Sequence, residues 1–237
     1  MEQRNHSFMR LAILGGTLSL ALNGEAATII DMGFTVPTPG SIGYNGGSAP
    51  LIGTNIEIDS IVAQSTPLHD SIASACVSCA MQFTSGSFST YNAALQTWSF
   101  NGGGAISVVG GVDFSDVAYT DIALGSTLLS GTFGSASVTK LPTGLFDFRI
   151  AAGSFTDNKH PELLAYYGLP LNVPYEGGFN LSFSATPLTN NGFASTVLYS
   201  GDLVNSPTEV PLPAAIWLLG SGLLALGSTR GVVRRDV

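Results

Sequence analysis

The chain has 237 residues, of which only 10% are charged and 29 are glycine. Few charges and many turn-forming residues are untypical of a helical enzyme and favour an all-β extracellular domain. Residues 27–209 hold three basic and thirteen acidic side chains, a net charge of −10. This balance excludes nucleic acid as a partner, which requires a basic surface, and it repels anionic lipid headgroups.

The N-terminus has the pattern of a secretory signal peptide. Arg4 and Arg10 precede an apolar run over 11–22, and small residues follow. We expect signal peptidase to cleave after Ala26, with Gly24 three positions before the cut, so that residues 1–26 are removed. The alternative is a membrane anchor, but twelve helical residues span about 18 Å, against about 30 Å for the bilayer core.

Candidate strands follow at short intervals, separated by turn residues, over 56–62, 81–84, 87–89, 97–100, 105–109, 117–124, 127–133, 136–140, 145–150, 179–185 and 194–202. A glycine-rich turn after the fourth of these predicts a hairpin in which Trp98 lies opposite Val108. Strict alternation predicts that Phe179, Leu181 and Phe183 share one face of a strand.

The cysteines, Cys76 and Cys79, predict a disulfide, since an exported protein meets an oxidising environment. A redox pair is the alternative, but it would be expected at the start of a helix, and the sequence here is strand-like. A zinc site is a further alternative, but only His69 lies near enough in sequence to help, and tetrahedral zinc requires four ligands.

Three acids, Asp113, Asp116 and Asp121, cluster in one expected turn. Carboxylate oxygens in a loop are calcium ligands, but a solvated turn is the interpretation we expect here. The histidines of the mature part, His69 and His160, are not accompanied by a nucleophile motif, so we expect no catalytic site. We accordingly predict no enzyme activity, no cofactor and no metal.

One segment has the signals of a short helix. Pro161 stands at its first turn and Gly168 directly after its end, so we predict a helix over 161–167. We expect Leu163 and Leu164 to face the sheet together with Tyr167. The predicted fold is therefore a β-sandwich with one short connecting helix.

This β-sandwich domain is expected to occupy residues 27–203, followed by a polar linker over 204–209. Aromatic side chains exposed on one face would indicate glycan binding, although in a sandwich most are core. The candidates are Tyr44, Tyr91, Trp98, Tyr166, Tyr167, Tyr175 and Tyr199.

The C-terminal sequence has three parts in succession. The first is a proline motif, Val210-Pro211-Leu212-Pro213-Ala214, whose prolines keep the backbone extended. The second is an apolar run over 214–229, about 24 Å long as a helix, which is enough to cross a thinned bilayer. The third is a group of arginines that we expect to remain cytoplasmic, namely Arg230, Arg234 and Arg235.

This tail, residues 210–237, resembles the PEP-CTERM family of sorting signals in its Val-Pro-Leu-Pro-Ala form. The common version carries Pro-Glu-Pro, and Leu212 stands here in place of the glutamate. The resemblance implies that the proline motif is recognised by an exosortase, an integral-membrane transpeptidase, and that the three arginines stop transfer through the inner membrane. It also implies a Gram-negative host that makes exopolysaccharide. The alternative is an ordinary single-span anchor.

Together these patterns predict a non-enzymatic exported protein of the cell surface or extracellular matrix, held for a time in the inner membrane and associated with exopolysaccharide or biofilm. A carbohydrate-binding module or adhesin on the same route is the alternative, and a secreted hydrolase is a third hypothesis.

Overall fold

The computed structural model describes residues 28–36, 38–141, 147–151, 155–171 and 173–208. In this part the chain forms twelve strands and one helix. The elements are β1 (Ile29–Gly33), β2 (Ser41–Tyr44), β3 (Pro50–Gln64), β4 (Ala73–Asn92), β5 (Thr97–Phe100), β6 (Ala105–Asp113), β7 (Ile122–Phe133), β8 (Ala136–Lys140), β9 (Asp147–Ala151), β10 (Phe155–Lys159), α1 (Pro161–Tyr167), β11 (Tyr175–Pro187) and β12 (Phe193–Pro207). The predicted all-β class is confirmed.

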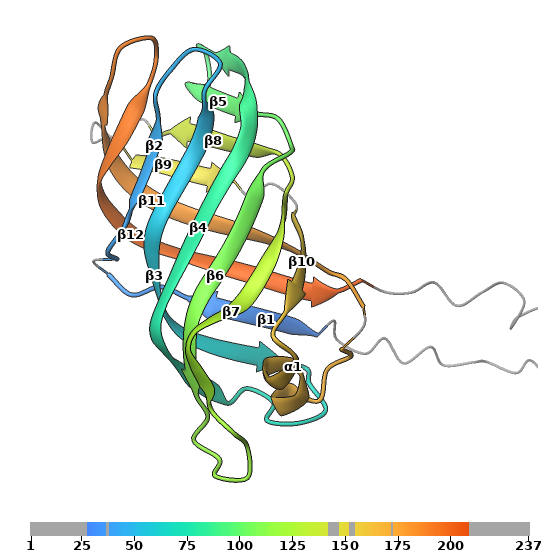
Figure 1. Cartoon of the computed structure of the whole chain (residues 1–237). Coiled ribbons are helices and arrows are strands. Elements are labelled where there is room, and N and C mark those ends of the chain that lie inside the picture. The colour runs from blue at the N-terminus through green and yellow to red at the C-terminus, as the bar shows by residue number, and fades with distance from the viewer. Residues whose placement is uncertain (1–27, 37, 142–146, 152–154, 172, 209–237) are drawn as a thin grey trace, which may run out of the picture.

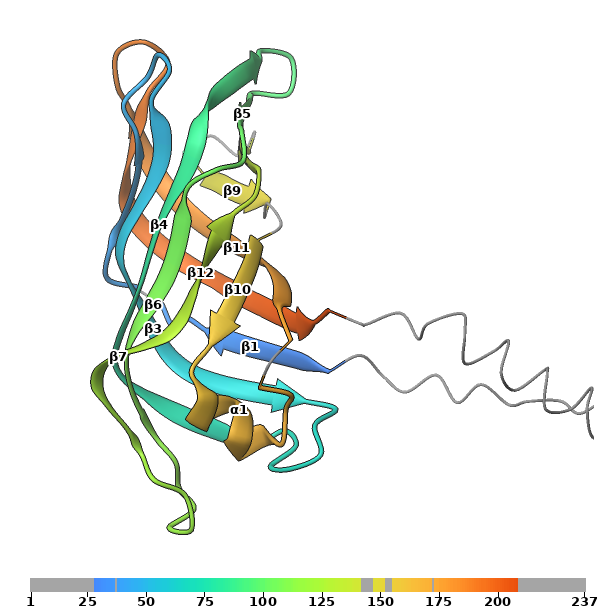
Figure 2. The ribbon, with the colours of Figure 1, turned by 45° about the vertical axis from the view of Figure 1, so that its right-hand side comes forward.

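The strands form two layers that cross each other. Figure 1 shows β2, β3, β4, β6 and β7 side by side in the nearer layer, with β11, β12 and β1 running across behind them, and Figure 2 shows the same layers turned by 45°. A single hydrophobic core fills the space between them and includes Met32, Phe83, Val108, Phe133 and Phe179.

Hydrogen bonds join the two layers into one antiparallel sheet that closes on itself. Towards one end the neighbours run β3–β4–β6–β7–β10–β11–β12–β1 and back to β3. Towards the other they run β3–β4–β5–β8–β9–β11–β12–β2 and back to β3. Every described strand therefore has a partner on both sides, which leaves no open edge in this part of the chain for pairing with another molecule.

The long strand β4 explains why the predicted hairpin of Trp98 and Val108 is wrong. One part of β4, 88–92, pairs with β5, and an earlier part, 75–84, pairs with β6. The second neighbours of these strands are β8 and β7, so β5 and β6 do not pair with each other. The turn between β5 and β6 instead leads from a strand beside residues 88–92 of β4 to a strand beside residues 75–84.

Other boundaries also differ from the expected ones. Residues 122–133 form the single strand β7, which passes through Gly125 at a positive φ of 79°. The strand β12 continues to Pro207, so residues 204–207, expected as linker, belong to the sheet. Strands β1, β2 and β10 were not predicted.

The helix α1 is confirmed over Pro161–Tyr167. Gly168 ends it in the left-handed conformation, with a φ of 70°. Leu163, Leu164 and Tyr167 are buried as expected, and so is Tyr166. The single O–H of Tyr167 is shared between two backbone oxygens, 3.1 Å away in β3 and 3.0 Å away in the following loop, and this contact attaches the helix to that end of the sheet.

Candidate functional site

The predicted address signals lie outside the described residues. These are the cleavage position Ala26, the sorting motif Val210, Pro211, Leu212, Pro213 and Ala214, and the charges Arg230, Arg234 and Arg235. Among the residues that are described, no helix is long and apolar enough to cross a membrane.

The described residues nearest to these signals lie side by side. Strand β1 pairs with β12 in antiparallel register, with Ile30 opposite Asn205, so the start of one strand adjoins the end of the other (Figures 1 and 2). The last described residue, Thr208, donates to the carbonyl oxygen of Pro174 from both its amide and its hydroxyl, at 3.0 and 2.8 Å. The folded domain therefore holds the attachment points of both terminal segments close together.

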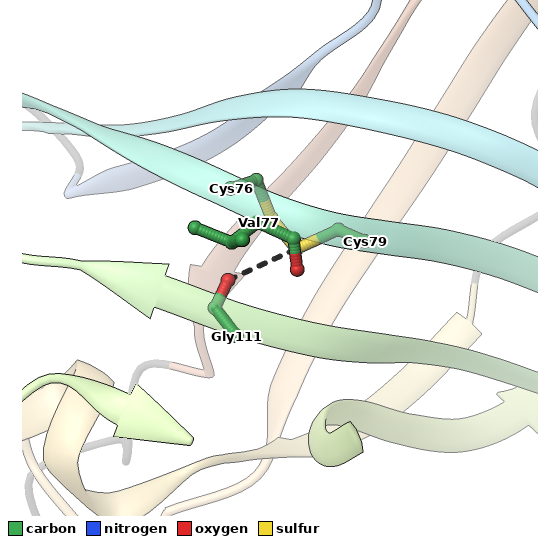
Figure 3. Close-up of a disulfide and its surroundings, with 4 residues drawn as sticks. All are labelled: Cys76, Val77, Cys79 and Gly111. Atoms are coloured by element: carbon green, nitrogen blue, oxygen red, sulfur yellow. Dashed lines mark hydrogen bonds between the residues drawn. A yellow bond between two sulfur atoms is a disulfide. The ribbon is translucent and has the colours of Figure 1, made fainter. Parts of the chain in front are cut away.

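The predicted disulfide joins Cys76 and Cys79 within β4, with a Cα–Cα distance of 5.6 Å (Figure 3). The bridge encloses a bulge in the ladder with β6, where Ser78 has a positive φ of 52°. It excludes a zinc site or free thiols at these positions, and closing so short a loop stabilises the bulge by about 2 kcal/mol. The Sγ atom of Cys79 lies 3.3 Å from the carbonyl oxygen of Gly111.

The structure brings His69 and Asp116 together. The imidazole stacks on Tyr166 with ring centroids 3.9 Å apart, and its Nε2 lies 3.2 Å from a carboxylate oxygen of Asp116. Its Nδ1 lies 2.7 Å from the backbone oxygen of Tyr166. Both partners are hydrogen-bond acceptors, so each ring nitrogen faces an acceptor and neither is placed to take a proton from a serine.

The acids near His69 shape a turn. The amide of Ala118 donates to Asp116, and that bond, followed by the one from His69, holds the pKa of this exposed carboxyl below its usual 3.8. Asp121 accepts a bond from the amide of Phe114 at 3.0 Å. In the described part of the chain no three His, Cys, Asp or Glu side chains are grouped so as to hold a metal ion.

Most of the aromatic candidates for glycan binding belong to the core. Tyr44, Trp98, Tyr166, Tyr167 and Tyr175 are buried. Tyr91 and Tyr199 are half-buried, so these seven residues do not form the flat row of exposed rings that would indicate glycan binding.

A pocket of about 180 Å³ nevertheless lies at the end of the molecule that carries β5 and the turn between β11 and β12. Its walls include Tyr91, Trp98, Lys140, Leu188, Asn191 and Phe193. The rings of Tyr91 and Trp98 are 4.8 Å apart, and the indole donates to the backbone oxygen of Asn191 at 2.9 Å. Apolar rings beside polar groups in a hollow are typical of a small-ligand site. The sequence pattern did not indicate the contribution of 187–193, because it depends on the β11–β12 turn folding back onto β5.

A second group that sequence reasoning missed is buried between β10 and β12. Counted as whole residues, backbone included, Asp157, Lys159 and Asn205 are 2%, 8% and 1% exposed. The sequence signal for it is alternation in β10, where Phe155, Asp157 and Lys159 occupy every second position and so share the inner face.

A comparison of the chain with known protein families, curated proteins and solved structures finds no match.

Proposed function

We propose that this chain is a non-enzymatic exported protein of the surface or extracellular matrix of a Gram-negative bacterium, associated with exopolysaccharide or biofilm. Signal peptidase removes residues 1–26. The tail then pauses in the inner membrane, and an exosortase-type transpeptidase recognises it at Val210–Ala214. The observation that carries the proposal is the sequence of the tail. A proline motif, an apolar run and an arginine group follow one another after the end of β12.

The arrangement of the domain supports this route. The attachment points of both terminal segments are adjacent, so the domain can stand on one side of the membrane with either segment inserted. A disulfide suits the oxidising periplasm. We infer that the domain serves as a rigid sandwich-like body. Its two layers belong to one hydrogen-bonded sheet, and among the described strands none has an open edge, which limits aggregation at a crowded surface.

Deleting residues 210–237 is expected to change the location of the protein. The shortened chain should leave the membrane fraction and appear in the periplasm or medium, because nothing then holds it at the bilayer. The double variant P211A/P213A should remain in the membrane as a larger, uncut species, because the extended motif is lost while the apolar run stays. Cell fractionation and immunoblotting measure both outcomes.

The matched control is Pro207→Ala, which removes a proline just before the motif, within β12. It should be sorted as the natural chain is. If the shortened chain instead stays with the cell as the full chain does, the sorting proposal is wrong.

The pocket favours one alternative, a carbohydrate-binding function on the same export route. A sugar ring could stack on the outer face of Tyr91, with polar groups from Gln96 and Asn191 beside it. Tyr91→Ala should then weaken binding to a glycan array or to the host exopolysaccharide about tenfold, while Tyr199→Ala, a half-buried tyrosine outside the pocket, should not. Equal binding by the natural chain and the Tyr91 variant would exclude this site.

A further inference from the structure

A buried polar cluster links three neighbouring strands of the sheet. Asp157 and Lys159 lie two residues apart on β10, and Asn205 lies on β12, with β11 between them. The side chains of Asp157 and Lys159 have no solvent exposure at all. Charged groups are almost never buried so completely unless they are paired, and a salt bridge in this setting gains little over an apolar pair of the same size.

One carboxylate bridges an amine and an amide in this cluster. The Lys159 amine is bonded to Oδ1 of Asp157, and Nδ2 of Asn205 donates to Oδ2 of the same carboxylate at 2.5 Å. Oδ1 of Asn205 is buried with no hydrogen-bond partner. The cluster thus holds a nucleophile and a carboxamide on the two oxygens of one acid–base group.

The backbone around the cluster leaves room for these contacts. A Cβ atom at Gly177 on β11 would lie 2.2 Å from Nδ2 of Asn205, and one at Gly131 on β7 would lie 2.8 Å from Cβ of Asp157. Only glycine at position 177 lets Asn205 reach across β11 towards β10. The ring of Tyr175 covers the amine, with its centroid 4.5 Å from Nζ of Lys159.

The electrostatics of the site favour the neutral forms of both ionisable groups. Burial lowers the pKa of Lys159 to about 8, against the opposing influence of Asp157. Burial also raises the pKa of Asp157, again opposed by its partner. A neutral amine is the nucleophilic form, and a protonated carboxyl is the form that can protonate a leaving group.

We propose that Lys159 and Asn205 become joined by an intramolecular amide bond, and that Asp157 catalyses its formation. The Nζ lone pair of Lys159 attacks Cγ of Asn205, and the new N–C bond forms. Asp157 gives its proton to Nδ2, the Cγ–Nδ2 bond breaks, and ammonia leaves. The carboxylate then takes a proton from Nζ, so that Asp157 is regenerated and no oxidant or cofactor is needed.

The product would remove the difficulty of a buried charge pair. The amide carries no charge, and its N–H and oxygen can both bond to the carboxyl of Asp157. It also ties β10 covalently to β12, the last strand before the tail. A covalent link between these strands resists both unfolding and force applied through the C-terminal end.

The test is the mass of the full chain, purified from its host in folded form, reduced, alkylated and cleaved after glutamate. The peptides 58–162 and 177–209 should be recovered as one joined species, about 17 Da lighter than their sum because one ammonia is lost. Fragmentation should place the link at Lys159 and Asn205. Two separate peptides of unmodified mass, from the folded natural chain, would overturn the proposal.

Variants locate the chemistry. Lys159→Arg keeps the positive charge but cannot form the amide, and Asp157→Asn removes the proton carrier, so both should yield separate peptides. Lys140→Arg, which replaces the other lysine of the sequence, should leave the joined species intact. A joined species that persists in Lys159→Arg would also overturn the proposal. If a variant does not fold, the peptide masses of the natural chain still test the proposal.

Discussion

Replacing Phe83 by alanine is expected to lower the free energy of unfolding by about 4 kcal/mol, because a buried ring is lost and its space cannot collapse. Phe83 on β4 packs against Phe133 and Phe179, with ring centroids 5.4 and 4.9 Å apart, and so joins the two layers at the centre of the core. For a domain of this size the melting temperature should fall by about 10 °C. Denaturant unfolding followed by fluorescence measures the change.

The residue opposite Phe83 in the sheet allows a double-variant test of the same packing. Gly53 on β3 is its cross-strand partner, and a Cβ atom there would lie 2.1 Å from the Phe83 ring. Gly53→Ala should therefore cost about 2 kcal/mol by overpacking. In the Phe83→Ala background the same change has room, so the two effects should fall short of their sum by about 2 kcal/mol.

The control for this pair is Leu95→Ala, which truncates a side chain that is 65% exposed and should change stability very little. Strict additivity of the Gly53 and Phe83 effects would contradict the packing described.

The sequence predicted those parts of the fold that depend on local pattern. The helix α1 is bounded by Pro161 and Gly168, whose conformational preferences act within a few residues. Phe179, Leu181 and Phe183 share the core face because side chains alternate along a strand. Cys76 and Cys79 are bridged, as the predicted exported compartment indicated.

What the sequence could not predict depends on contacts between distant strands. The pairing of β4 with both β5 and β6 follows from its length, which was hidden by Gly and Ser residues that interrupt its apolar pattern. Strand β12 continues beyond the apparent end of its pattern because Asn205 is held inside by Asp157. A polar residue in a linker-like sequence gives no local sign of such a partner, and the cluster of Asp157, Lys159 and Asn205 was missed for this reason.

When the amide cannot form, the stability of the domain should depend on pH through the free amine of Lys159. Asn205→Ala leaves Lys159 as a free buried amine, whose pKa is about 8 in the folded chain and 10.5 when unfolded. Between these values the unfolded chain binds more protons than the folded chain, so the free energy of unfolding should rise with pH, by about 2 kcal/mol from pH 8 to pH 10.

Two groups that face Lys159, Tyr175 and Asp157, limit the pH range over which stability rises. Burial raises the pKa of Tyr175 from 10.0 to about 12, so above pH 10 this phenol makes the folded state less stable as pH rises, and the window closes there. Burial raises the pKa of Asp157 above 3.8, so its own effect is a loss of stability as pH rises from the acid side.

In the natural chain the Lys159 nitrogen belongs to the proposed amide and does not titrate, so the free energy of unfolding should not rise from pH 8 to pH 10. It should fall slightly towards pH 10, where the tyrosines whose pKa burial raises begin to ionise in the unfolded chain. The double variant N205A/K159M should not show a rise either, which assigns the rise in the single variant to Lys159. A rising profile in the natural chain would mean that the amine is free and would contradict the amide. A flat profile in Asn205→Ala would contradict the lowered pKa itself, so the two claims are tested separately by the same titration.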